Sequence, residues 1–301
     1  MTSGMSTMRF TLSVDDGHPL DLRLADRLAA HGIPATFYVP TTNCEGPPVM
    51  SAPQLRSLAS QFELGSHTAE HRFLAQLDRV AAWRQVRDGK AALEDTLGRR
   101  VDGFCYPGGR YRREHVALVR AAGFTHARTT QNLRTDAGHP AFEMPTTLQF
   151  YPHPRRVLVR NFVSQRHWRL RRPVLAAALA ERDWLGRLYA LFSHACRQGA
   201  VFHLWLHTVD IEALRLWQAL DEFLACVARR VPPAQRLTND DLYGELYGGL
   251  YRALHGDLHA VDTVTRVTPF NGPCGGTSDS SGRLASRCPE GWRSPFHTIR
   301  K

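Results

Sequence analysis

The sequence predicts an α/β fold in which short apolar strands alternate with amphipathic helices along most of the chain. Three observations support this prediction. The alternation is regular up to about residue 130, polar side chains follow several of the strands, and 301 residues are enough for one α/β barrel of about 250 residues. A composition of 43% hydrophobic and 22% charged residues is typical of a globular protein. Strict alternation favours a parallel sheet, and here we expect the sheet to close on itself.

The strands are predicted from short runs of β-forming residues. Residues 9–14 (RFTLSV) stop at Asp15-Asp16-Gly17, as a strand stops at the rim of a barrel, so function is expected at that end. Residues 200–207 are almost wholly apolar, which is typical of a strand buried on both faces. The other strands are expected at 34–40, 62–66, 103–109, which breaks into a glycine-rich turn, 124–130, and within 144–151.

The helices are predicted from apolar residues at helical spacing and from glycines at their ends. Leu216, Leu220, Phe223 and Val227 share one stripe of the helix expected at 212–230. The other helices are expected at 22–31, 53–60, 79–97, 114–122 and across most of 175–199. Regular patterning falls over residues 132–172, apart from the strand within 144–151.

The chain is predicted to divide at Val231, before Pro232-Pro233. Residues 1–231 would form the catalytic barrel. Residues 232–301 would form an irregular, largely unpacked extension, since glycine, serine, proline and arginine dominate from Asn271 onward.

Basic residues are abundant, with a formal net charge of +10, and they are almost all arginine. The densest cluster runs from Arg155 to Arg172, and we interpret it as a solvated surface. A functional alternative is contact with a phosphate on a carrier lipid, nucleotide or polysaccharide. No recognition helix and no aromatic-basic interleaving stands out, so no nucleic-acid partner is expected.

The cysteine spacing and the lack of a long apolar run indicate the cellular compartment that we expect for this protein. The six cysteines form no C-x-x-C pair, which argues against a zinc ribbon or a disulfide scaffold and favours reduced thiols. There is no run of about 18 apolar residues, so no transmembrane segment is expected. The first residues lack the pattern of a secretory signal, and we therefore expect a cytoplasmic protein.

Histidine pairs four residues apart can direct two imidazoles at one cation. The chain contains three such pairs, at 67/71, 203/207 and 255/259, and spacing cannot choose among them. The pair at 255/259 falls in the irregular extension and is interpreted as surface. The first pair is favoured because Asp15 and Asp16 end a strand-like run upstream. Two imidazoles and one carboxylate leave room for water, which is the composition of a hydrolytic metal centre.

Four motifs in order then establish a resemblance, which covers roughly residues 8–231. They are Ser13-Val14-Asp15-Asp16-Gly17, His67-Thr68-Ala69-Glu70-His71, residues 104–109, and Leu204-Trp205-Leu206-His207. Together they resemble the T-F-D-D-G segment, the H-[ST]-x-x-H segment, the third motif and the L-x-L-H motif of the NodB-homology polysaccharide deacetylases, carbohydrate esterase family 4. The resemblance implies a distorted (β/α) barrel and a divalent metal.

By this resemblance Asp16, His67 and His71 would hold the metal, with Zn²⁺ expected and Co²⁺ or Mn²⁺ as alternatives. Asp15 would be the general base. The chemistry agrees, because a dication bound by one of two adjacent carboxylates relieves their repulsion and keeps the other ionised. A purely structural alternative is that the two aspartates cap the following segment.

The remaining site residues are also expected from the resemblance. A backbone N–H near Gly108 would help to bind the oxyanion, and His207 would protonate the departing amine. Tyr106 and Trp205 are expected to pack in the core, although either could line the substrate cleft. His207 could instead be a hydrogen-bonded core histidine, and His203 is interpreted as structural.

One departure from the family pattern concerns the arginine that orients the base, because Cys105 occupies its position. A neutral thiol cannot form that ion pair. We therefore consider Arg128 or Arg110 as substitutes. The family's fourth motif is not recognisable near residues 127–132.

The sequence thus predicts a metal-dependent hydrolase that removes an acetyl group from an N-acetylated amino sugar in a polysaccharide, glycolipid precursor or glycoside. One alternative keeps the barrel and metal but makes the enzyme a deformylase or a cyclic-amide hydrolase. Another is a carbohydrate-binding barrel that has lost catalysis. The oligomeric state does not follow from the sequence.

Overall fold

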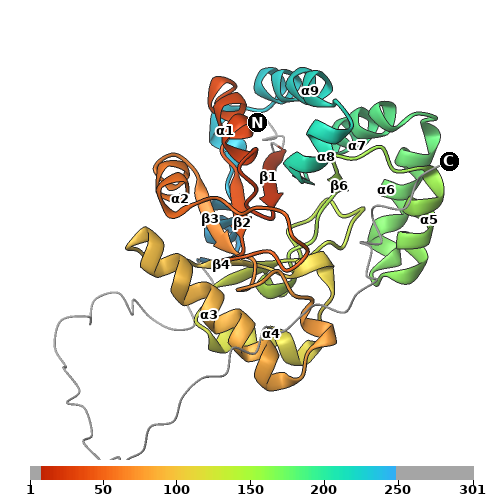
Figure 1. Ribbon diagram of the computed structural model, residues 1–301. Coiled ribbons are helices and arrows are strands. Elements are labelled where there is room, and N and C mark those ends of the chain that lie inside the picture. The colour runs from red at the N-terminus through yellow and green to blue at the C-terminus, as the bar shows by residue number, and fades with distance from the viewer. Residues whose placement is uncertain (1–7, 249–301) are drawn as a thin grey trace, which may run out of the picture. The chain divides into compact units, whose positions relative to one another are not determined.

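A curled parallel sheet forms the centre of the computed structural model, which describes residues 8–248 (Figure 1). The strands follow one another in the order β5-β4-β3-β2-β1-β7-β6, and β8 pairs with β1. They are β1 (Arg9–Asp15), β2 (Thr36–Val39), β3 (Glu63–Ser66), β4 (Gly103–Cys105), β5 (His126–Arg128), β6 (Leu148–Gln149), β7 (Val201–Leu206) and β8 (Arg236–Leu237). The predicted α/β fold, a distorted barrel of parallel strands with helices around it, is confirmed.

Strand β1 lies at the middle of the sheet because its residues are apolar or small on both faces. It pairs with β7 over six residues, from Arg9 to Val14. Its second neighbour changes along its length: β8 lies beside Phe10 and Thr11, whereas β2 lies beside Ser13 to Asp15. All residues of β1 after Arg9 are buried, as expected for a strand enclosed on both sides.

Residues 144–149, which include β6, connect β5 to β7. The N–H of Met144 donates to the carbonyl of Ala127 in β5 at 2.9 Å, and the N–H of Thr147 donates to the carbonyl of His203 in β7 at 2.8 Å. The barrel is therefore distorted at this point, because one short segment bonds in turn to β5 and to β7.

Helices surround this sheet, and Figure 1 shows α5 and α6 as a pair beside it. The α-helices are α1 (Asp21–Ala30), α2 (Ala52–Ala59), α3 (Arg79–Leu97), α4 (Arg113–Ala121), α5 (Arg155–Ser164), α6 (Trp168–Ala180), α7 (Trp184–Gln198), α8 (Thr208–Ala213), α9 (Trp217–Arg230) and α10 (Asn239–Tyr243). Shorter helical turns are η1 (Leu74–Gln76), η2 (Pro107–Gly109), η3 (Ala141–Glu143), η4 (Pro233–Gln235) and η5 (Gly244–Gly248). Among residues 8–248, no helix is both long enough and apolar enough to cross a membrane.

The helix predicted at 79–97 is confirmed with the same bounds, since Asp78 caps its first turn and Gly98 ends it. The helix predicted at 212–230 is wrong as a single element, because the structure divides it into α8 and α9. Arg215 adopts a left-handed backbone with φ 56° between them. The apolar stripe from Leu216 to Val227 lies after this break, so its period carries no information about the residues before it.

The stretch 132–172 is more regular than its sequence predicts. It contains α5 and the start of α6, and only Leu158 of α5 is buried, so the helix carries little apolar periodicity. The interpretation of the arginine cluster as a solvated surface is also corrected at Arg171, whose side chain is fully buried.

The packed part of the chain extends past the boundary expected at 231. Strand β8 joins the sheet, and α10 follows it with Leu242 and Asn239 buried. The N–H of Asn239 donates to the hydroxyl of Thr36 at 2.9 Å, and its amide donates to the hydroxyl of Tyr38 at 2.8 Å. The remainder of the expected extension, including the histidine pair at 255/259, lies outside the described residues.

Candidate active site and metal centre

The carboxyl ends of the central strands meet at one rim of the barrel. The register pairs Asp15 with Tyr38, Val39 with Ser66, and Cys105 with Arg128. The residues that directly follow β1, β3 and β7 are Asp16, His67 and His207, three of the residues singled out from the sequence. Parallel pairing therefore brings positions up to 191 residues apart in sequence to one edge.

Asp16, His67 and His71 form a compact cluster at this rim. Oδ1 of Asp16 lies 3.1 Å from Nε2 of His71 and 3.6 Å from Nε2 of His67. The two imidazole rings are 5.0 Å apart between centroids. One ligand atom from each residue falls within 4.8 Å of the others. This is the set of three ligands predicted from the sequence, and the structure brings them together.

Two of these three residues have a left-handed backbone, with φ 80° at Asp16 and 57° at His71. Residues other than glycine adopt this conformation at a cost of about 1–3 kcal/mol, and such residues concentrate at functional sites. Thr68, in the same turn as His71, has φ 70°. The backbone is thus bent to direct both side chains at one point.

The donor set of this cluster fits a divalent transition metal. Nδ1 of His67 lies 2.8 Å from the carbonyl oxygen of Cys105, which requires a proton on Nδ1 and leaves the Nε2 lone pair directed at the cluster. Oδ1 of Asp16 is buried and has no hydrogen-bond donor among the described residues. Two neutral imidazole nitrogens and one carboxylate oxygen would hold Zn²⁺ and leave a coordination position for water.

The electrostatics of the cluster agree with this assignment. Burial lowers the pKa of His67 to about 4, so the ring is neutral and able to bind a metal at neutral pH. Burial alone would raise the pKa of the Asp16 carboxyl group, but the imidazoles of His207 and His71 outweigh it and hold that pKa well below its usual range. Asp16 is therefore ionised.

Helix α3 holds the turn that carries His71. The N–H of Ala69 donates to the carbonyl of Gln85 at 2.9 Å, and the Gln85 side chain exchanges hydrogen bonds with Glu70 at 2.9 and 2.8 Å. A Cβ on Gly89 would lie 2.6 Å from the carbonyl carbon of Thr68, so the helix approaches this turn backbone to backbone. Gln85 and Gly89 were not predicted from the sequence. The signal available was a glycine inside a long helix, which often marks close packing.

Asp15 lies beside the cluster and is held by a buried arginine. A guanidinium nitrogen of Arg128 donates to Oδ1 of Asp15, and neither side chain is more than 4% exposed. The guanidinium carbon also lies over the rings of Tyr38 and Trp205, 5.3 and 5.2 Å from their centroids. Of the two arginines considered from the sequence, Arg128 is therefore the one that contacts Asp15. The guanidinium of Arg110 instead lies 4.9 Å from the ring centroid of Phe73.

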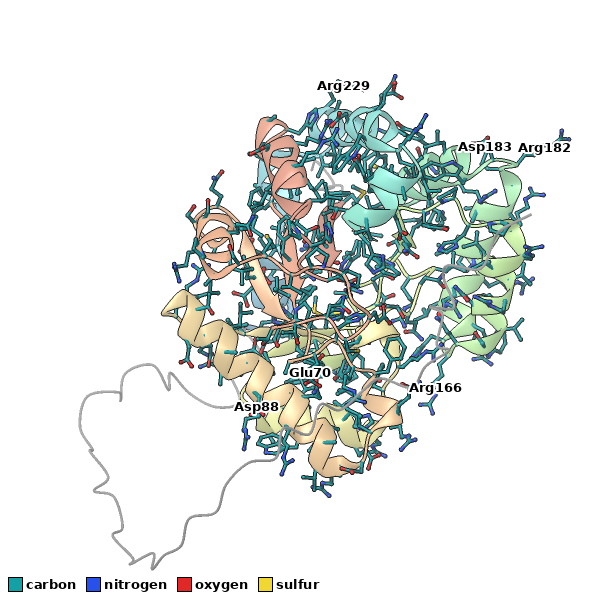
Figure 2. The ribbon with its side chains drawn as sticks, in the orientation of Figure 1. Glu70, Asp88, Arg166, Arg182, Asp183 and Arg229 are labelled. Atoms are coloured by element: carbon teal, nitrogen blue, oxygen red, sulfur yellow. The ribbon has the colours of Figure 1, made fainter. Side chains whose placement is uncertain are left out.

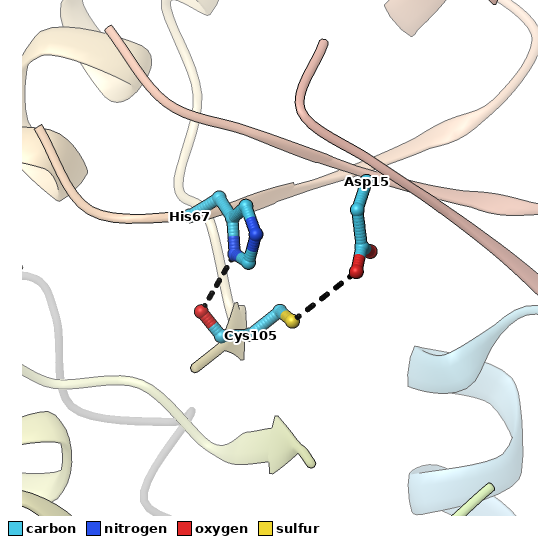
Figure 3. Close-up of side chains that lie close together, drawn as sticks. All are labelled: Asp15, His67 and Cys105. Carbon is cyan, nitrogen blue, oxygen red and sulfur yellow. Dashed lines mark hydrogen bonds between the residues drawn. The ribbon is translucent and has the colours of Figure 1, made fainter. Parts of the chain in front are cut away.

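Cys105 contacts the same carboxylate from the strand beside Arg128, as Figure 3 shows. Its sulfur lies 3.9 Å from Oδ2 of Asp15, and its carbonyl oxygen accepts the bond from His67. Burial raises the pKa of the Cys105 thiol well above its usual value, so the thiol stays protonated. Asp15, His67 and Cys105 also lie close enough to bind a metal, but a protonated thiol and a carboxylate paired with Arg128 suit a cation poorly.

His207 lies beside Asp16 at the rim. Its Nε2 lies 3.8 Å from Oδ2 of Asp16, and its Nδ1 lies 3.2 Å from Oδ2 of Asp210. Burial would lower the pKa of His207, but the carboxylates of Asp16 and Asp210 outweigh it and raise the pKa to about 9. The side chains of Asp16 and His207 are each 20% exposed, whereas that of His67 is 1% exposed, so solvent reaches the cluster from this side. Asp210 was missed from the sequence, although its position three residues after His207 places it on the next turn.

His203 and Trp205, the other two residues considered from the sequence in this region, lie in β7. His203 is buried, and its Nε2 lies 2.9 Å from the hydroxyl of Ser13 within the sheet. Trp205 is also buried and packs against Arg128. Both side chains therefore belong to the interior of the barrel.

Tyr106, for which both core packing and a place in the substrate cleft were considered, lies in the interior. Its side chain is fully buried, its hydroxyl donates to the carbonyl of Phe142 at 3.2 Å, and its ring stacks on Tyr111 at 4.1 Å between centroids. Gly108 has a left-handed backbone with φ 58°, and a Cβ there would lie 2.9 Å from the ring of Phe73. The oxyanion role of Gly108 stays a prediction.

Comparison with known families agrees with this geometry. Residues 4–127 match the family model described as polysaccharide deacetylase. The match covers less than half of the chain and shows that this part is similar to a family of hydrolases, which act on carbon–nitrogen bonds other than peptide bonds. The matched segment contains Asp15, Asp16, His67 and His71, whereas Arg128 and His207 lie beyond it.

Solved structures of polysaccharide deacetylases have the same fold. A protein from Mycobacterium smegmatis described as a polysaccharide deacetylase aligns with a TM-score of 0.50 and 15% identity, covering 90% of this chain and 97% of that one. The T48 deacetylase, solved with substrate, aligns with a TM-score of 0.50 and 15% identity, covering 79% and 92%. The Streptococcus pyogenes deacetylase PplD, in complex with acetate, aligns over 46% of this chain and 62% of its own, with a TM-score of 0.41 and 20% identity. No curated protein sequence matches the chain.

Proposed function

We propose that this polysaccharide deacetylase is a metal-dependent N-deacetylase that hydrolyses the acetamide of an N-acetylated amino sugar. The observation that carries the proposal is the convergence of Asp16, His67 and His71 beside an aspartate that is paired with a buried arginine. A metal held by these three residues, with Zn²⁺ proposed, would supply Lewis-acid activation of the amide carbonyl and of water.

Asp15 would act as the general base. Arg128 occupies Oδ1, and Oδ2 would accept the proton of the attacking water. The Cys105 thiol, a weak donor at 3.9 Å, would not compete strongly for this oxygen.

His207 would act as the general acid. Asp210 fixes the orientation of the ring through Nδ1, so that Nε2 faces the cluster. A pKa of about 9 keeps the imidazole protonated at neutral pH. The proton on Nε2 would pass to the amine, which leaves poorly as an anion.

The proposal is tested by metal analysis coupled to product detection. The purified chain is expected to hold a divalent metal in a one-to-one ratio and to release acetate from N-acetylated amino sugars. Asp16→Asn should lose the metal and all turnover, whereas Asp15→Asn should retain the metal and lose turnover. Asp26→Asn changes an exposed carboxylate on α1 and provides the matched control, with both properties intact.

The outcomes also separate the proposal from its alternatives. Release of formate from N-formylated amino sugars, without acetate release, would identify a deformylase, and activity on cyclic amides alone would identify a cyclic-amide hydrolase. A stoichiometric metal together with sugar binding and no hydrolysis of any amide would indicate a barrel that has lost catalysis. Location in the cytoplasm stays a prediction.

A further inference from the structure

The exposed surface of the α5–α6 pair combines positive charge with apolar side chains. The segment 155–172 contains seven arginines and no acidic residue. Six of these arginines are exposed, and Arg171 is buried. Figure 2 shows Arg166 projecting outward at the end of this pair. The six exposed arginines are Arg155, Arg156, Arg160, Arg166, Arg169 and Arg172.

Exposed apolar residues concentrate on the same segment. Val163 is 78% exposed, Trp168 and Leu170 are each 56% exposed, and Val159 is 41% exposed. These are four of the seven large hydrophobic residues that are exposed among residues 8–248. Scattered single residues of this kind are ordinary on a protein surface, but a group within twelve residues is a mark of an interaction site. We call these four residues and the six exposed arginines the α5–α6 face.

Arg171 holds this face in a fixed conformation. Its guanidinium donates to the carbonyls of Asn132, Phe162 and Asn161 at 2.8, 3.0 and 3.0 Å. It also donates to the side-chain oxygen of Asn132 at 2.9 Å. The end of α5 is thus joined both to α6 and to the loop that follows β5.

The α5–α6 face also flanks the rim that carries the candidate site. Asn132 lies four residues after Arg128 at the carboxyl end of β5. Gln149, six residues before the start of α5, places its side-chain amide 3.4 Å from Nδ1 of His207. The start of α5 and the turn between α5 and α6 are therefore each linked, within a few residues, to a strand that ends at the rim.

We propose that the α5–α6 face binds the surface of a membrane rich in anionic phospholipids. Arginines at the level of the headgroups are attracted by the negative surface potential, while tryptophan and aliphatic side chains enter the boundary between headgroups and acyl chains. A second copy of the chain is a poorer occupant, because two such faces would oppose arginines with arginines. Nucleic acid would satisfy the arginines and leave Val163 and Leu170 without an apolar partner.

The membrane proposal stands apart from the chemistry of the site. Its consequence, that the site would act on amino sugars carried by a lipid, rests on the proposed function. Vesicle binding is therefore measured without any assay of turnover. The membrane proposal can then fail while the proposed deacetylase function stands, and the reverse is also possible.

The test is sedimentation of the full chain with vesicles. We expect binding to vesicles with about one-third phosphatidylglycerol and little binding to pure phosphatidylcholine, with affinity falling as salt rises. Replacing Val163, Trp168 and Leu170 together by serine should weaken binding at least about tenfold. Replacing Arg166, Arg169 and Arg172 by glutamine should weaken it about fivefold for each arginine.

The matched control lies on α3, where Arg79 and Val80 are also exposed, Val80 by 61%. Arg79→Gln combined with Val80→Ser should leave vesicle binding unchanged. Circular dichroism and thermal unfolding verify that each variant is folded. The proposal is overturned if the wild-type chain does not bind anionic vesicles, or if the α5–α6 variants bind as well as the control. If the chain forms a dimer that the serine variant abolishes, the face binds a second copy and the membrane proposal is overturned. If the chain binds nucleic acid and not vesicles, the membrane proposal is overturned in favour of nucleic acid.

Discussion

At the scale of single residues, Arg128 supplies the positive charge beside Asp15 that Cys105 cannot supply. The motif position that usually supplies the cation holds a buried, protonated thiol. The neighbouring strand instead supplies a guanidinium that is buried between Tyr38 and Trp205. An arginine in this setting stays charged, because the nearby carboxylate offsets the effect of burial and raises the pKa of Arg128. The same counter-charge is therefore delivered to Asp15 from a different element.

Replacement of Arg128 tests this role. Arg128→Met should lower turnover by about 100-fold, because it leaves the Asp15 carboxylate buried without a counter-charge. Metal content should not change, since the three ligands lie elsewhere. Arg128→Lys, which keeps the charge, should recover part of the activity and serves as the second variant if the methionine form folds poorly. Full turnover in the metal-loaded Arg128→Met variant would show that Arg128 is not needed to hold Asp15 for catalysis.

Asp210 provides a prediction about pH. It accepts a hydrogen bond from His207 and contributes to raising the pKa of that ring to about 9. The acid must be protonated to act, so activity should fall as the pH rises through the His207 pKa. In Asp210→Asn that pKa should drop, and the alkaline limb of the kcat profile should move to lower pH by about one pH unit. The limb should not move in Asp26→Asn. If the alkaline limb does not move in Asp210→Asn, a group other than His207 is responsible for it.

At the scale of elements, the close approach of α3 to the turn at residues 68–71 sets the position of His71. Gly89→Ala would add a Cβ at 2.6 Å from backbone atoms of that turn. We expect a loss of about 1–3 kcal/mol in the free energy of unfolding and a metal affinity lowered by about tenfold. Gly186→Ala on α7 is the control, since the nearest atoms there are carboxylate ends that can move. Titration of the apo-protein with zinc measures the effect, and equal affinities in both variants would contradict it.

The α5–α6 pair depends in the same way on Arg171. Arg171→Leu would leave the carbonyls of Asn132, Asn161 and Phe162 without their donor. The expected loss in the free energy of unfolding is about 2–4 kcal/mol, measured by urea denaturation. Arg172→Leu, one residue away and exposed, should change stability by less than about 0.5 kcal/mol. Similar values for the two variants would mean that the buried hydrogen bonds of Arg171 contribute little.

At the scale of the whole molecule, residues 236–243 extend the packed sheet region past residue 231. Strand β8 lies against the start of β1, and α10 covers the sheet with Leu242, which is 1% exposed. Leu242→Ala should lower the free energy of unfolding by about 2–4 kcal/mol because it opens a cavity in a packed region. Leu246, which is 39% exposed, provides the control, and its alanine variant should be nearly neutral. Equal effects would show that α10 is not part of the cooperative unit.

The sequence was a good guide where a local pattern and the tertiary fold agree. Short apolar runs predicted most of the strands, and Gly98 predicted the end of α3, because these features act within a few residues of one another. It was a poor guide to α5, which carries valines on its exposed side as well as Leu158 on its buried side. It also missed the division between α8 and α9, because one left-handed residue, Arg215, precedes the apolar stripe.

The sequence by itself therefore determined the alternation of strands and helices, the family resemblance, and the residue types able to hold a metal. Only the tertiary structure decided which arginine meets Asp15, which carboxylate orients His207, and which arginine of the cluster is buried. The physical reason is distance along the chain. Arg128 follows Asp15 by 113 residues, and nothing in the local composition specifies that β5 and β1 end at the same rim. That contact exists because a curled parallel sheet brings the carboxyl ends of its strands together.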